Sequence, residues 1–433
     1  MAHLPIAAGK AVSRISTLTK RSGSTWPGHV ALKIDTNLIS NILKLNPQLS
    51  IILVAGTNGK TTTTKLIEDV LVTQGQKVFR NDSGANLLNG ITSTFIKHSK
   101  LNGKINYDTA VFEIDESSLL LLLSEFSSTQ NKLSIILLNL FRDQLDRYGE
   151  VNGIAKKWLN SLQKLPKETI LITNGDDPML RFIGENSNLH SFYFGLSEKH
   201  MKKMDTPHDV DFLFCPHCET ELTYSKRSYS HMGIFKCSSC KFEHKKTATF
   251  DELPNPMFGI YNKYNINAAA LLLQKSYDVS EEQVKKTLVA FAPAFGRQEK
   301  IEYKGKHIFL LLSKNPTGFN QSIQAILEQD KTPNLLLLLN DRIPDGLDIS
   351  WIWDVEFENL SNAKYITISG DRSFDMGLRI KYADIKTFEV IENLEQAIDT
   401  AVAKTSATDT LYILSTYSAM LETRKILLGK SIL

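Results

Sequence analysis

The stretch VAGTNGKTTTTK, residues 54–65, decides the fold class, because it joins an apolar run to a segment of helical character. It matches the phosphate-binding loop G-x-x-x-x-G-K-[ST], except that Val54 stands where the first glycine is usual. In such loops, backbone N–H groups at a helix N-terminus hold phosphate, the lysine reaches the terminal phosphates, and a hydroxyl binds Mg²⁺. We therefore predict a nucleotide and Mg²⁺ site formed by Gly56, Thr57, Asn58, Gly59, Lys60, Thr61 and Thr62.

Strand-like runs alternate with helical stretches on both sides of this loop. The runs lie at 51–55, 109–114, 134–140 and 169–173, and a second series lies at 307–313, 334–340, 364–370 and 410–416. This alternation predicts an α/β fold with parallel sheets covered by helices. The expected domains are a helical segment at 1–45, a nucleotide-binding domain at 46–300 with an insertion at 206–248, and a Rossmann-like domain at 301–433.

Composition excludes several classes of protein. The 433 residues are 42% apolar and 22% charged, which is typical of two or three globular domains. Basic residues (50) nearly balance acidic ones (47), so we expect no nucleic-acid partner. The leucine run at 335–339, like that at 119–123, is far below the roughly 18 residues that a membrane span needs. We expect a cytoplasmic protein.

The N-terminus is basic, with no acid before Asp35. Its apolar residues recur at helical spacing, but no apolar core is long enough for a signal peptide. Two interpretations remain open: the helix packs on the domain, or it lies peripherally on the anionic inner face of the membrane.

Carboxylates are expected beside the loop. Glu113 ends a buried-looking strand, where a carboxylate is costly without a partner, so we predict a ligand of Mg²⁺ or substrate. Asp115 and Glu116 have the simpler interpretation of acids at a helix N-terminus. Asn139, Arg142, Asp143 and Asp146 follow the next strand, where ligands of open α/β sheets bind. A solvated, salt-bridged helix is the alternative.

The four cysteines form C-x₂-C-x₁₈-C-x₂-C, the spacing of a structural zinc ribbon. Disulfides are the alternative, disfavoured by a reducing cytosol. We expect His217 and His231 on the surface. The predicted Zn²⁺ ligands are Cys215, Cys218, Cys237 and Cys240.

Several of these motifs together resemble the central domain of the Mur ligases. They are GTNGKTT, the Glu113 strand, N-x-x-x-D-x-L-D at 139–146, and YNKYN at 261–265 before an Ala-rich helix. The match narrows to the MurT family, the ligase subunits of lipid II isoglutaminyl synthase. SGAN and GITS within 83–93, FRDQLDRYGE, the four-cysteine insertion, KNPTGFN and DGLDISWIWD all resemble that family.

The resemblance implies a reaction. It implies ATP-dependent conversion of the D-glutamate α-carboxylate of the lipid II stem peptide to an acyl phosphate, and then to D-isoglutamine by ammonia. It also implies that Asn262 and Asn265 lie by the adenine and Arg297 near the phosphates. The chain departs from the family pattern at Ser83, and from other Mur ligases at Gln144, Leu311 and Lys314. A domain that holds UDP-sugars is also missing, which favours a lipid-linked substrate.

A partner is expected as well. Glutamine-derived ammonia requires a cysteine nucleophile, and all four cysteines are assigned to zinc. The resemblance implies a GatD-type glutamine amidotransferase, to whose catalytic triad Asp348 is donated; Asp345 is the nearest rival. Trp351 and Trp353 predict a partner-facing loop. The alternatives are a folate-type amide ligase and a zinc-ribbon ATPase that binds nucleic acid.

Overall fold

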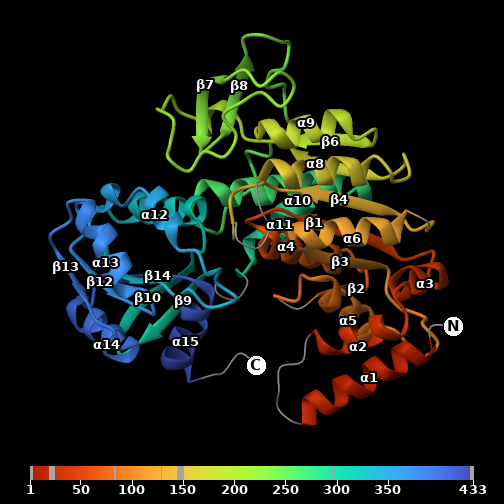
Figure 1. The fold of residues 1–433 in the computed structure, drawn as a ribbon, viewed down its shortest axis with the longest axis horizontal. Coiled ribbons are helices and arrows are strands. Elements are labelled where there is room, and N and C mark those ends of the chain that lie inside the picture. Colours follow the sequence, from red (N-terminus) through yellow and green to blue (C-terminus); the bar gives the residue numbers. More distant parts are fainter. Residues whose placement is uncertain are drawn as a thin grey trace.

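The computed structural model describes residues 3–18, 25–81, 84–127, 129–143, 151–293 and 297–429. Within these residues lie two six-stranded sheets and one two-stranded sheet. Figure 1 shows the two large sheets side by side, with the two-stranded sheet above the first.

The first sheet is wholly parallel and carries the predicted nucleotide site. Its strand order is β2-β3-β1-β4-β5-β6. The four predicted strands are confirmed, whereas the short β2 and the half-buried β6 have no clear apolar run and were not predicted. The bounds are β1 Ser50–Ala55, β2 Val78–Arg80, β3 Thr109–Ile114, β4 Leu133–Leu137, β5 Ile170–Asn174 and β6 His190–Phe194.

Helices cover both faces of this sheet. Leu53 and Ala55 enter one core and Ile52 and Val54 the other, because successive side chains of a strand point to opposite faces. Both cores are apolar, as expected of a parallel sheet buried on two sides. The helices are α1 His3–Leu18, α2 Trp26–Ile34, α3 Leu38–Leu45, α4 Lys60–Thr73, α5 Leu88–His98, α6 Glu116–Phe126, α8 Val151–Leu162, α9 Pro178–Asn186, η1 Glu198–His200, α10 Ile260–Tyr277 and α11 Glu281–Val289.

The predicted insertion holds a small sheet of two antiparallel strands, β7 Leu222–Tyr229 and β8 Met232–Cys237. The turn between β7 and β8 packs against the first domain and so joins the insertion to it. His231 in this turn is 0% exposed, so the prediction that it lies on the surface is wrong. Its ring packs against Phe141 and Phe212, and its Nε2 lies 3.3 Å from the buried Asp177 carboxylate.

The second sheet has the order β13-β12-β11-β14-β10-β9, and only β9 is antiparallel to its neighbour among the described strands. The boundary predicted at 300/301 falls inside β9. The strands are β9 Arg297–Tyr303, β10 Lys306–Leu312, β11 Asn334–Leu338, β12 Tyr365–Ser369, β13 Phe388–Val390 and β14 Thr410–Ser415. The helices are α12 Pro316–Gln329, η2 Ser350–Asp354, η3 Phe357–Leu360, α13 Ser373–Tyr382, α14 Leu394–Lys404 and α15 Tyr417–Leu428.

Among the described helices, none combines the length and the apolar composition required to cross a membrane.

Candidate functional site

The loop at 56–59 leaves β1 and enters α4 through two glycines with positive φ. These are Gly56 at +141° and Gly59 at +91°. A Cβ on Gly59 would lie 2.1 Å from Asn265 Oδ1, so this position needs glycine for space as well as for conformation. Val54, at the usual position of the first glycine, is a buried residue of β1. That position is regular strand, so valine is compatible with the loop.

The end of β4 holds the loop in place. Asn139 accepts a hydrogen bond from Asn58 N–H at 2.8 Å and donates one to the Asn58 carbonyl at 3.0 Å. Thr57 Oγ1 donates to the Phe141 carbonyl and accepts from the Phe141 N–H. The loop is therefore fixed by paired contacts from the neighbouring strand. Asn139 therefore acts as a support of the loop.

Glu113 and Thr61 come together as the Mg²⁺ prediction requires. In β3, Glu113 pairs in register with Val54, which brings its side chain to the carboxyl end of the sheet beside the loop. The carboxylate is 2% exposed and accepts hydrogen bonds from Thr61 Oγ1 at 2.5 Å and Gly84 N–H at 3.1 Å. Mg²⁺ takes hard oxygen ligands, and a hydroxyl and a carboxylate so close together can supply two of them. Their role as ligands stays a prediction.

The Lys60 ammonium lies over the loop, where it donates to the carbonyls of Gly56 (2.5 Å) and Thr57 (3.2 Å). It also lies 3.7 Å from Glu116 Oε2. Burial raises the pKa of the Glu116 carboxyl, and the nearby Lys60 charge opposes that rise. Asp115 caps α6 by accepting from Ser117 N–H, which agrees with the simpler interpretation of that acid.

A cavity lies between the loop and the second sheet and is lined by residues of both. Asn262 and Asn265 line it from α10, and Asn265 Nδ2 donates to Asn262 Oδ1 at 3.2 Å. Both predicted asparagines border this cavity beside Gly59, and their contact with adenine stays a prediction. Arg297 begins β9, but its side chain lies outside the described residues, so its phosphate contact stays a prediction.

The N-terminus of α12 reaches the loop from the other side. Asn315, which caps this helix, exchanges hydrogen bonds with Asn58 at 3.3 and 3.4 Å. Lys314 forms a short ion pair with Asp143. These residues join the two large sheets across the site.

A second cavity adjoins this contact. Arg142, Lys314 and Asp348 all line it. Asp348 is exposed and accepts from Ser350 N–H at 2.8 Å. Asp345, by contrast, is buried and accepts from the backbone and hydroxyl of Ser418. Asp345 therefore stabilises the turn, and Asp348 is the acid of this pair that a partner can reach.

Arg142 connects three parts of the chain. Its guanidinium lies 2.5 Å from Asp211 of the insertion and 3.2 Å from Asp354 beside the tryptophans. Neither contact could be predicted, because the three residues are distant in sequence. The role of Asn315 has a sequence signal, because Asn-Pro before a helical pattern is typical of an N-cap. Ser83, Gln144 and Asp146 lie outside the described residues.

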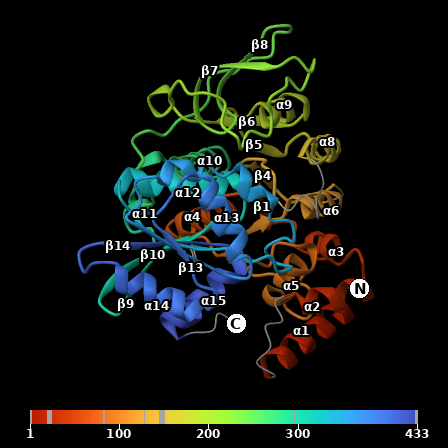
Figure 2. The ribbon, with the colours of Figure 1, turned by 60° about the vertical axis from the view of Figure 1, so that its left-hand side comes forward.

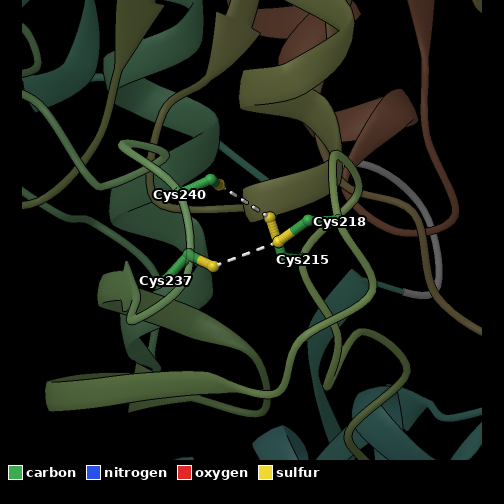
Figure 3. Close-up of side chains that lie close together, drawn as sticks. All are labelled: Cys215, Cys218, Cys237 and Cys240. Carbon is green, nitrogen blue, oxygen red and sulfur yellow. Dashed lines mark hydrogen bonds between the residues drawn. The ribbon is translucent and has the colours of Figure 1, made fainter.

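The four cysteines gather at one end of the small sheet (Figure 3). All four sulfurs lie within 4.8 Å of one another. Cys215 and Cys240 are 3.6 Å apart and Cys218 and Cys237 are 3.4 Å apart. Zinc bound tetrahedrally at about 2.3 Å requires sulfur edges of about 3.8 Å, whereas a disulfide requires about 2 Å. The donors fit a zinc ion better than they fit disulfides.

Comparison with known proteins identifies the family. The profile described as Mur ligase middle domain matches residues 54–273, and that described as MurT ligase C-terminal matches 312–420. The MurT subunit of lipid II isoglutaminyl synthase (glutamine-hydrolysing) from Streptococcus pneumoniae R6 is 31% identical over 95% of this chain and 93% of its own length. The chain belongs to the MurT family. The MurT subunit of Staphylococcus aureus COL is 30% identical over 92% of this chain and 90% of its own length.

A solved structure supports the fold. The pseudomurein peptide ligase type C of Methanothermus fervidus superposes with a TM-score of 0.63 at 22% identity, covering 90% of this chain and 80% of that protein. At this identity the likeness shows the fold alone: the Mur ligase fold, with its parallel sheet and a C-terminal sheet domain. Membership in a Mur ligase family implies ATP and Mg²⁺ as cofactors.

Proposed function

We propose that this protein is the ligase subunit of a lipid II isoglutaminyl synthase. The observation that carries the proposal is its similarity, over nearly the whole chain, to MurT subunits named for that activity. The reaction amidates the α-carboxylate of D-glutamate in the stem peptide, giving D-isoglutamine. A folate-type ligase is not favoured, because both full-length relatives described above are MurT subunits.

The reaction has two steps. A carboxylate oxygen of the substrate attacks the γ-phosphorus of ATP, ADP leaves, and an acyl phosphate forms. Ammonia then attacks the acyl carbon, loses a proton, and expels phosphate as the C–O bond breaks. The backbone N–H groups of the loop at 56–59 and the Lys60 ammonium bind the phosphates. We propose that Asn262 and Asn265 bind the adenine and, from the resemblance alone, that Arg297 contacts the phosphates.

Thr61 and Glu113 would hold Mg²⁺. When bound, the ion neutralises phosphate charge during transfer. The hydrogen bond between these two side chains supports the assignment, because it shows that a hydroxyl oxygen and a carboxylate oxygen lie close enough for one ion to bind both. The N–H of Gly84 then orients the second carboxylate oxygen.

We propose that zinc occupies the four-cysteine cluster and stabilises the insertion. The distances between the sulfur atoms support this proposal, because they are close to those of four sulfurs around one zinc ion. Purified protein should contain about one Zn²⁺ per chain, measured by elemental mass spectrometry. Cys237→Ser should lower the zinc content and the melting temperature of the protein, while Ser238→Ala, beside it in the sequence, should change neither. Zinc-free fresh protein would contradict the proposal.

Ammonia must come from another chain, which we propose is a GatD-type glutamine amidotransferase. Every cysteine lies in the four-sulfur cluster, so no other thiol can serve as a glutaminase nucleophile. We assign Asp348 as the third member of the partner's catalytic triad. The cavity lined by Asp348 and Lys314 is also lined by Asn315, which bonds to Asn58 of the loop, and we propose that ammonia passes this way.

Exposed apolar side chains beside the Asp348 turn mark the partner surface. On α13, Phe374, Leu378 and Tyr382 recur every four residues and are 66%, 48% and 70% exposed. The Trp353 ring lies 5.5 Å from the Tyr382 ring. We call Trp353, Phe374, Leu378 and Tyr382 the α13 stripe. Large exposed aromatic residues of this kind are typical of interface anchors.

The direct test supplies lipid II in detergent with ATP and Mg²⁺, and follows amidation by mass spectrometry. With ammonium salt, this chain alone should amidate the substrate; with glutamine, it should do so only when the amidotransferase is added. ATP hydrolysis without amidation under both conditions would contradict the proposed function. Strong stimulation of that hydrolysis by DNA or RNA would favour the nucleic-acid ATPase instead.

We also propose that the protein works at the inner surface of the cytoplasmic membrane, since its proposed substrate is lipid-linked.

A further inference from the structure

We infer that the outer face of α1 is a binding site for an anionic phospholipid bilayer. In both views α1 lies at the edge of the molecule (Figures 1 and 2). Its inner side packs on α2 and α5. A Cβ on Gly9 would lie 2.7 Å from Ile96 Cδ1 and 3.1 Å from the Pro27 carbonyl. The inner side is therefore in close contact with the domain, and the outer side is available to a ligand.

The outer side carries an apolar stripe. Leu4, Ile15 and Leu18 are 69%, 60% and 83% exposed, although leucine and isoleucine are usually buried. With two exposed alanines they recur at intervals of three or four residues, which places them on one face of a helix. We call this set the α1 stripe; its members are Leu4, Ala7, Ala11, Ile15 and Leu18.

Basic residues border the α1 stripe, and an exposed aromatic residue begins the next helix. Lys10 and Arg14 are one turn apart on α1, and at about 100° per residue they lie along one side of the stripe. Trp26, which begins α2, is 60% exposed. Apolar residues flanked by cations, with a nearby tryptophan, are typical of helices that lie in the membrane interface.

Charge complementarity favours a bilayer over a protein partner. Residues 1–34 contain five Lys and Arg and no Asp or Glu, whereas the whole chain has 50 and 47. The other 399 residues therefore hold 45 basic and 47 acidic side chains. Of these five, Lys10 and Arg14 lie beside the α1 stripe, and the basic excess of this segment of the chain suits attraction to anionic lipid headgroups.

Membrane docking would also orient the nucleotide site. The Gly28 N–H donates to Ser93 Oγ at 2.8 Å, which ties α2 to α5. The loop that precedes α5 reaches the site, where Gly84 N–H donates to Glu113. α5 has 11 residues, and at 1.5 Å per residue it spans about 16 Å. The inference that docking brings the nucleotide site to its substrate rests on the proposed function. The inference that α1 binds the bilayer does not rest on it.

Vesicle sedimentation tests the binding. The full chain with its partner subunit should sediment with vesicles of phosphatidylglycerol and phosphatidylcholine in equal parts, and much less with phosphatidylcholine alone. Ile15→Glu/Leu18→Glu should weaken partitioning at least tenfold. Lys10→Gln/Arg14→Gln should weaken it about fivefold per charge. Val289→Glu alters another exposed apolar residue, on α11, and should have no effect.

The outcomes separate this inference from the proposed function. If the wild-type protein does not sediment with the anionic vesicles, or if Ile15→Glu/Leu18→Glu sediments like wild type, the inference is wrong. Self-association through this face without vesicle binding would also overturn it. Amidation of detergent-solubilised lipid II should be equal in wild type and Ile15→Glu/Leu18→Glu. If neither the wild-type protein nor Ile15→Glu/Leu18→Glu amidates lipid II, the proposed function is wrong, and the result of the vesicle experiment still stands.

Discussion

At the scale of single residues, the nucleotide loop combines rigid backbone with adaptable side chains. Gly56 and Gly59 adopt conformations that suit glycine, and Asn139 fixes Asn58 by two hydrogen bonds. Lys60, in contrast, bonds to loop carbonyls that a phosphate would replace as its partner. The protein's own contacts therefore hold the backbone of the loop, and the Lys60 ammonium lies within reach of that loop.

Replacing Lys60 tests this site. Lys60→Ala should reduce ammonium-dependent amidation by about 10³-fold or more, because no other described side chain of the loop can neutralise the terminal phosphates. The measurement is the rate of ADP release with lipid II. Lys65→Ala, on the same helix, is the matched control. It loses an ion pair with Asp69 worth about 0.5 kcal/mol, and should keep its activity.

Near-normal turnover in Lys60→Ala would remove the phosphate site from this loop. Circular dichroism should establish that the variant folds, since Lys60 is buried beside Glu116.

The local chemistry of this site could be predicted because its signals are local. The loop motif, the Glu113 strand end and the cysteine spacing each lie within a short segment. The pairing of Lys314 with Asp143 could not be predicted, since it depends on how the second sheet sits against the first. The prediction that His231 lies on the surface is wrong because the sequence does not reveal its buried partner, Asp177.

At the scale of elements, buried polar contacts attach the insertion to the rest of the molecule. Asp209, in the insertion, is buried and hydrogen-bonded to Thr317 of α12. Burial raises the pKa of the Asp209 carboxyl from 3.8 to about 6, and the Thr317 hydrogen bond opposes that rise. The folded protein therefore holds this proton more tightly than the unfolded chain does.

The sign of the pH dependence follows from that raised pKa. Between pH 3.8 and about 6 the folded state binds more protons than the unfolded state, so this group's contribution to stability falls as pH rises through that window. Asp209→Asn should remove this loss of stability. Above pH 6 the free energy of unfolding of the variant should exceed that of wild type by at most about 3 kcal/mol. The melting-temperature difference from wild type should grow with pH and then level off.

The exposed Asp205→Asn, four residues earlier, is the control and should show no such trend. A pH-independent difference for Asp209→Asn would mean that its carboxyl titrates normally in the fold.

Strand prediction at this scale depended on burial. The central strands β1, β3 and β4 are buried along almost their whole length, so they form continuous apolar runs. Edge strands β2 and β13 have three residues each and are partly exposed, which leaves no comparable signal. β9 is polar, RQEKIEY, and its pairing depends on the turn at Lys304 and Gly305.

At the scale of the whole molecule, three surfaces have separate proposed tasks. The α1 stripe faces the bilayer, the cavities between the sheets hold the reaction, and the α13 stripe faces the amidotransferase. Substitutions on one surface should therefore leave the other functions intact.

The α13 stripe can be tested on its own. Phe374→Asp/Leu378→Asp should weaken partner binding by about tenfold or more, because interface anchors each contribute roughly 1–2 kcal/mol. Ammonium-dependent amidation should not change. Isothermal titration calorimetry with the amidotransferase gives the affinity, and Val289→Asp is the matched control for an exposed apolar residue elsewhere. Unchanged affinity would place the partner on another face.

Asp348 connects the partner surface to the reaction. In a glutaminase triad, a carboxylate fixes the tautomer of the histidine and stabilises its charged form. Asp348 is exposed on the turn next to the α13 stripe, whereas Asp345 is buried against Ser418. The arrangement makes Asp348 the acid that can reach a histidine of another chain.

Asp348→Asn should therefore lower glutamine-dependent amidation by about 10⁴-fold, as loss of a triad carboxylate does. The loss should affect glutamine hydrolysis alone. Asparagine can still accept the Ser350 N–H, so the turn, ATP use and partner binding should persist. Ammonium salt should restore the product, since ammonia then needs no glutaminase. Asp341→Asn, an acid of the same loop that is paired with Arg372, should keep glutamine-dependent activity. Equal loss with glutamine and with ammonium would instead assign Asp348 to the ligase step or to the fold.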